Sequence, residues 1–294
     1  MNHPAYSGST VSRTRVEQAH PTDTGTQPRL RRELRAVRVL WQREMIRLFR
    51  SRARLLMTLL TPLLFLCVLG IGMGRMVDPD SPGSYLAYVF PGALLMAVQM
   101  PALGIGSSLV WDREVGFLRE MLVAPVRRST LLVGKCMGGA TAAAAQGAIL
   151  LIFAGVAGVP YHPWLFVLLF LQLLLISMTL AALGALVAVW IKRMETFQTV
   201  LGLITMPLFF LSGALFTTDG LPGWLHTLTL VNPLSYAVDA LRRTTQSFMS
   251  EAPLSAGLTW NGVQPPVLLE LLVMCVLGAA ALALAARGFA RAAE

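Results

Sequence analysis

Six long stretches of this chain together contain only one charged residue. The length of each is close to the ~20 residues with which a helix crosses the hydrocarbon core of a bilayer. The stretches are 55–74, 86–110, 138–159, 164–190, 197–217 and 266–286. Charged residues make up 13% of the chain, against about 25% in soluble domains. The sequence therefore predicts an all-α membrane protein with six transmembrane helices.

Basic residues gather in alternate connections between these stretches. Of the 24 Lys and Arg residues, 21 lie in 1–54, 111–137, 191–196 and 287–294, and 3 lie in the other connections. Cytoplasmic connections carry the excess of Lys and Arg, so both termini, including the C-terminal segment 289–294, are expected in the cytoplasm. Basic residues beside spans also contact anionic lipid. The net charge of +9 thus indicates membrane lipids as partners and no nucleic acid.

The N-terminal region divides near residue 28. Residues 1–28 are rich in Ser, Thr, Pro, Gln and His, which predicts a disordered cytoplasmic tail. Apolar residues in 29–54 recur at helical spacing with arginines mostly elsewhere: Leu30, Leu34, Val37, Trp41, Met45 and Leu48. This pattern predicts an amphipathic helix in the inner membrane interface. The alternative is a basic segment that only orients the first span.

The connection 111–137 is too polar to cross a membrane and too regular for a plain linker. Its first part, 111–123, reads as a short amphipathic helix. Ala124-Pro125 is expected to end that helix, because the residue before proline avoids helical geometry. A basic segment, 126–135, then leads back to the membrane. The helix would present charge and shape to a cytoplasmic partner; the alternative is a loop that only joins two spans.

The connection 218–265 contains an apolar face of its own. That face comprises Leu221, Trp224, Leu225, Leu228 and Leu230. Asn232-Pro233 marks a turn, and a second short helix is expected over 234–243. In that helix Asp239 is close enough to pair with Arg242 or Arg243. Trp224 and Tyr236 suit a membrane interface. The alternative with a purely structural role is therefore a cap at that interface.

Glu270 is the one acid placed inside a predicted span. Deep in a membrane it would indicate a proton-coupled site. Pro265-Pro266 begin this helix, however, and put Glu270 in the first turns, where the helix dipole favours an acid and interfacial water is near. We therefore favour a structural role.

Several short motifs follow one another along the chain and together cover most of residues 30–290. They are Phe90-Pro91-Gly92; Glu114-x-Gly116-x-x-Arg119-x-x-x-Leu122-x-Ala124-Pro125; Gly134-Lys135; Leu211-Ser212-Gly213-Ala214-Leu215-Phe216 with Leu221-Pro222-x-Trp224-Leu225; and Asn232-Pro233-Leu234-x-Tyr236-Ala237-Val238-Asp239-Ala240-Leu241-Arg242. The set resembles the ABC-2 type export permeases, including daunorubicin-resistance and nodulation lipo-oligosaccharide exporters. The Ser/Thr-rich tail lies outside the resemblance.

The resemblance implies a transmembrane domain over 55–288 in a bacterial inner membrane, with two such chains and two cytoplasmic ABC ATPase subunits. The second permease is another copy of this chain or a related one. The connection after the second span would contact the ATPase through Glu114, Gly116, Arg119, Glu120, Ala124 and Pro125. Short outer-face helices near the exit would include Trp224, Leu225, Leu228, Tyr236, Asp239 and Arg242.

Motifs for chemistry within the chain are missing. Gly134-Lys135-Cys136 lacks the earlier glycine and the following hydroxyl of a phosphate-binding loop, and the four histidines are scattered. We expect no enzyme activity and no cofactor in this chain, with ATP and Mg bound by the partner ATPase. The predicted function is export of a hydrophobic, amphipathic or lipid-linked cargo, such as a drug, lipid or glycan carrier. The alternatives are a secondary transporter or channel not coupled to ATP, and a membrane-bound transferase.

Overall fold

The computed structural model describes residues 29–50, 52–77, 82–115, 128–216, 221–249, 257–260 and 263–291. The tail 1–28 and residues 116–127, which are most of the connection predicted to contact an ATPase, lie outside them. Over the described residues the fold is all-helical, and its only β-type pairing is an isolated bridge between Trp260 and Val263. The helices are α1 (Arg29–Arg50), α2 (Arg52–Phe65), α3 (Gly72–Val77), α4 (Pro82–Leu103), α5 (Ile105–Glu114), α7 (Arg128–Leu150), α8 (Pro163–Trp190), α9 (Met194–Phe210), α10 (Gly223–Val231), α11 (Pro233–Gln246) and α12 (Val267–Arg291).

Five helical stretches are long and apolar enough to cross a membrane. They are Leu55–Gly74, Tyr85–Glu114, Ser129–Ala157, Pro163–Trp190 and Val267–Phe289. The first joins α2 to α3 through the π-helical η1 (Leu66–Ile71), and the third continues α7 into the 3-10 helix η2 (Leu151–Ala157). The stretch predicted at 197–217 is instead the shorter apolar helix α9. A sixth span therefore stays a prediction.

α9 ends at Phe210 because the residues that follow it find other hydrogen-bond partners. Gly213 adopts a φ of 72°, which turns the chain out of the right-handed helix. The carbonyl oxygen of Gly213 accepts from Tyr88 and Arg242, and that of Leu208 accepts from the Asn232 amide. Side chains from α4, α11 and the residue before α11 thus satisfy carbonyls that a longer helix would have paired internally.

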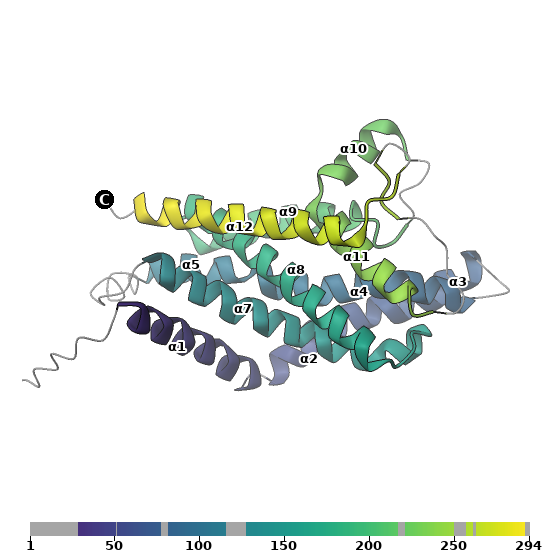
Figure 1. Ribbon diagram of the computed structural model, residues 1–294, viewed down its shortest axis with the longest axis horizontal. Coiled ribbons are helices and arrows are strands. Elements are labelled where there is room, and N and C mark those ends of the chain that lie inside the picture. Colours follow the sequence, from purple (N-terminus) through teal and green to yellow (C-terminus); the bar gives the residue numbers. More distant parts are fainter. Residues whose placement is uncertain are drawn as a thin grey trace, which may run out of the picture.

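The long helices α4, α7, α8 and α12 run along the longest axis of the molecule, and the short α5 continues α4 in the same direction (Figure 1). α8 contacts each of the other four. Small residues allow this packing, since they let helix backbones approach closely. Buried Ala181, Gly184 and Ala185 in α8 are examples. The ends of α5, α8 and α12 lie at one end of the bundle, and α10 and α11 lie toward the opposite end.

α1 runs beside α7 (Figure 1). Gly134 and Gly138 of α7 face the backbone of α1, and Trp41 Nε1 donates to Thr141 Oγ1 at 2.9 Å. One face of α1 is therefore held by protein, and its placement in the membrane interface stays a prediction. α7 also begins earlier than expected: most of the segment 126–135, predicted as a connection, is its first turns, so Lys135 lies within a helix.

Candidate functional site

The last turn of α5 forms a junction between helices, just before the connection predicted to meet an ATPase. Of the residues assigned to that contact, Glu114 alone is described; Gly116, Arg119, Glu120, Ala124 and Pro125 lie outside the described residues. The side chains of three successive residues in this turn contact different helices: Asp112, Arg113 and Glu114. We call these three residues the α5 stem.

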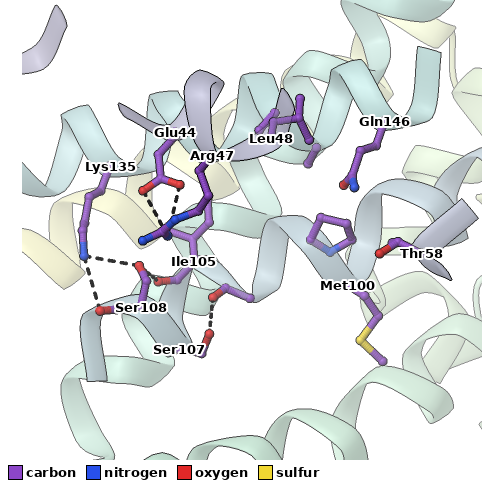
Figure 2. A pocket seen from close by; sticks show the side chains of 15 residues that line it. Glu44, Arg47, Leu48, Thr58, Met100, Ile105, Ser107, Ser108, Lys135 and Gln146 are labelled. Carbon is purple, nitrogen blue, oxygen red and sulfur yellow. Dashed lines mark hydrogen bonds and ion pairs between the residues drawn. The ribbon is translucent and has the colours of Figure 1, made fainter. Parts of the chain in front are cut away.

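Asp112 fixes α5 to α7. Its carboxylate forms an ion pair with Lys135, and both residues are buried, at 7% and 4% exposure. Lys135 Nζ also donates to the carbonyl and hydroxyl oxygens of Ser108, each at 3.3 Å (Figure 2). A buried ion pair adds little net stability, but removing one partner leaves an uncompensated charge and typically costs about 3–5 kcal/mol. The pair therefore fixes the mutual position of α5 and α7.

Arg113 fixes α5 to the ends of α8 and α12. Its Nη1 lies 3.4 Å from the carbonyl oxygens of Ala188 and Val189, in the last turn of α8. Unpaired carbonyls at a helix C-terminus attract a cation. The guanidinium carbon also lies 5.1 Å from the ring centroid of Phe289 in α12, within the range of a cation–π contact.

Glu114 connects α5 to the first residue of α9. Its Oε2 accepts a hydrogen bond from the Met194 amide at 3.3 Å. The residue before α9, Arg193, supplies no side-chain cap of its own. A carboxylate at a helix N-terminus satisfies an unpaired amide and complements the helix dipole. A displacement of the α5 stem would therefore be passed to α7, α8, α9 and α12 together.

Sequence reasoning assigned Glu114 to this region but not Asp112, Arg113 or Lys135 as its anchors. A partial signal was present for two of them, because Asp112 and Arg113 follow the apolar stretch 86–110 without an intervening Gly or Pro. The partners lie far along the chain, for example 75 residues away between Arg113 and Ala188. Without the fold, nothing in the sequence joins them.

A second polar cluster connects α11 to α4 and α12. The guanidinium of Arg242 lies 3.8 Å from the centroid of the Tyr88 ring, and its Nη2 donates to the carbonyl of Gly213 at 2.7 Å. Arg243 Nη1 lies 3.8 Å from Asp239 Oδ2 and 3.4 Å from Glu270 Oε1. Of the two arginines expected to pair with Asp239, Arg243 is therefore the partner. Glu270 is in the first turn of α12, as expected, but its side chain is fully buried rather than in reach of interfacial water.

The six residues assigned to the outer-face helices fall into two groups. On α10, Trp224 is 68% exposed, Leu228 is exposed and Leu225 is half-buried. On α11, Tyr236, Asp239 and Arg242 are buried. The Tyr236 hydroxyl donates to the Leu230 carbonyl at 2.8 Å, and burial raises the pKa of this phenol, which keeps it a donor. α10 therefore offers an apolar surface, while α11 forms internal contacts.

Comparison with known proteins agrees with this architecture. The family model described as ABC-2 type transporter matches residues 35–245. The chain is 28% identical over 211 residues to the Inner membrane transport permease YadH of Escherichia coli K12, covering 70% of this chain and 81% of that protein. It is 30% identical over 207 residues to Nodulation protein J of Rhizobium leguminosarum bv. trifolii, covering 69% of this chain and 78% of that protein.

The long apolar helices and these relatives make the chain a multi-pass membrane protein of the transport permease class, not an enzyme. It belongs to the ABC-2 type transporter family, whose model spans most of its length. The resemblance seen in the sequence motifs is thereby confirmed.

Proposed function

We propose that this chain is the permease subunit of an ATP-driven exporter and that the α5 stem passes movement from a separate ATPase to the membrane helices. The connection 116–127 would dock on that ATPase, which would bind ATP and Mg. The observation that carries the proposal is that three successive side chains at the base of the connection hold four different helices. A passive linker has no need of such an anchor.

The proposed orientation places the α5 stem, α1 and the ends of α8 and α12 on the cytoplasmic side. The charge asymmetry of the connections supports it. α9 would complete six spans with the help of the turn at 211–216, and α1 would lie at the inner interface while packing against α7. Both termini would then be cytoplasmic, in a bacterial inner membrane.

The proposed route lies between two permease copies and leaves near 212–248. Apolar side chains exposed on α9 and α10 support it, because they need lipid or a second chain as neighbours: Leu203, Met206, Phe210, Trp224 and Val231. A hydrated pore would need charged or polar rings, and the spans contain few. We therefore propose an amphipathic or lipid-linked cargo. YadH and Nodulation protein J, by their names a transport permease and a nodulation protein, do not narrow the cargo further.

The test is reconstitution of the permease with its ATPase in proteoliposomes. Glu114→Ala removes the carboxylate that accepts from the Met194 amide at the start of α9. The control, Glu195→Ala, removes an exposed carboxylate from the next residue of α9. A hydrogen bond to a charged group is worth about 1.5–3 kcal/mol. Its loss in Glu114→Ala is expected to lower export per ATP hydrolysed roughly tenfold or more, with Glu195→Ala near wild type. Equal export in the two variants would contradict the proposed role of the stem. Export driven by a proton gradient without ATP would support the secondary-transporter alternative instead.

A further inference from the structure

A cleft of about 380 Å³ separates the N-terminal helices from the bundle, and its two ends differ in chemistry (Figure 2). Walls come from α1, α2, α4, α5 and α7. One end is charged and polar, with Glu44, Arg47, Ser107, Ser108 and Lys135. The rest of the lining carries no charged side chain; it combines apolar residues such as Leu48 and Met100 with the polar Thr58 and Gln146. A lining of this kind suits an amphiphile, with its head at the polar end.

A second cleft of about 370 Å³ adjoins the polar end. The two share Arg47, Ser107 and Ser108, and the second adds Arg43 and Trp111 to the lining. Trp111 is 56% exposed, and tryptophan is enriched at the level of lipid headgroups. The wall made of these residues and Asp112 combines two arginines, two hydroxyl groups, one carboxylate and an exposed aromatic ring.

The charges at this wall leave an excess of positive charge. Lys135 and Asp112 compensate each other, and Glu44 lies 3.4 Å from Arg47. Arg43 is exposed and forms no hydrogen bond or ion pair with another residue in the described part of the chain. Arginine binds phosphate oxygens in a planar, two-pronged geometry, and basic pockets between transmembrane helices on the cytoplasmic side accept lipid headgroups.

We propose that the joined clefts bind an anionic phospholipid, with its phosphate at Arg43 and Arg47 and an acyl chain along Leu48 and Met100. The lipid would fill the space between α1–α2 and the bundle, where α1 otherwise rests mainly on α7. Its assignment to the inner leaflet rests on the orientation proposed above. Its binding does not depend on whether the chain exports cargo with ATP, so the two proposals can fail separately.

The test measures thermal unfolding of the purified full-length permease with its ATPase, in detergent. The probes are phosphatidylglycerol, phosphatidylcholine with the same acyl chains, and inorganic phosphate. Phosphatidylglycerol is expected to raise the unfolding temperature, and the other two are expected to leave it unchanged at equal concentration. An equal rise with phosphatidylcholine would show that charge plays no part, and an equal rise with inorganic phosphate would show an anion site without a lipid; each result overturns the proposal.

Matched variants locate the site. Arg43→Gln with Arg47→Gln is expected to weaken phosphatidylglycerol binding at least tenfold. Arg31→Gln with Arg38→Gln removes the same charge from exposed positions of α1 that line neither cleft and is expected to bind as the wild type does. Native mass spectrometry provides a second reading, since the wild-type complex is expected to retain phosphatidylglycerol through purification. Equal affinity in the two double variants would overturn the proposal even if both unfold at lower temperature.

Discussion

Gly106 of α5 meets Gly184 of α8 backbone to backbone: a Cβ atom added to Gly106 would lie 2.2 Å from the Gly184 carbonyl oxygen. No side-chain rotation relieves such a contact, because the neighbour is main chain. The approach determines how close the end of α5 comes to α8. It therefore determines whether Arg113 reaches the carbonyls of Ala188 and Val189.

Gly106→Ala is therefore expected to destabilise the permease. Overpacking of a tight contact costs about 1–3 kcal/mol, which lowers the unfolding temperature of the purified protein. Gly202→Ala is the control, since a Cβ there meets nothing within 4 Å and alanine favours a helix by about 1 kcal/mol over glycine. If both variants unfold at the wild-type temperature, α5 and α8 do not approach as described.

Breaking the ion pair between Asp112 and Lys135 is expected to cost more with one partner removed than with both. Asp112→Leu alone leaves a buried ammonium group, at a cost of about 3–5 kcal/mol. Asp112→Leu with Lys135→Met replaces the pair by apolar side chains and is expected to recover most of that loss. The measurement is the unfolding temperature of single and double variants in one detergent. A double variant less stable than Asp112→Leu would show that the pair stabilises the helices by itself.

The proposed topology predicts which engineered cysteines are accessible from outside the cell. In a variant without native cysteines, a cysteine replacing Ser250 is expected to react with a membrane-impermeant thiol reagent in intact cells. A cysteine replacing Ser129, at the start of α7, is expected to react only after lysis. The reverse pattern would invert the orientation and move the α5 stem to the outer face.

Truncating apolar side chains on the surface of α10 is expected to impair export without stopping ATP hydrolysis by the partner ATPase. Trp224→Ala with Leu228→Ala removes two exposed apolar side chains, and export of hydrophobic compounds is expected to fall several-fold while basal ATP hydrolysis stays near wild type. Thr227→Ala, exposed on the same helix, is the control. Unchanged export, or free conduction of small ions by the complex without ATP, would contradict an exit route along this surface.

Much of the architecture could be predicted because its signals are local. A run of apolar residues long enough to cross a bilayer is visible in the sequence, and five of the six predicted stretches are long apolar helices. Motif order likewise led to the ABC-2 family, which the family model confirms. The limits of helices were less predictable. α9 stops at Phe210 because Tyr88, Asn232 and Arg242 donate to the carbonyls around its end, and these donors come from α4, from the residue before α11 and from α11.

The sequence by itself determined the apolar helices and the connections in which basic residues gather, because hydrophobic length and charge are properties of contiguous segments. Only the tertiary structure decided which charges meet. Helical spacing allowed Asp239 either arginine, and the packing of α11 against α4 turned Arg242 toward Tyr88 and left Arg243 for Asp239 and Glu270. The contacts of the α5 stem could not be predicted from the sequence either, since its partners on α7, α8, α9 and α12 come within reach only when the helices pack.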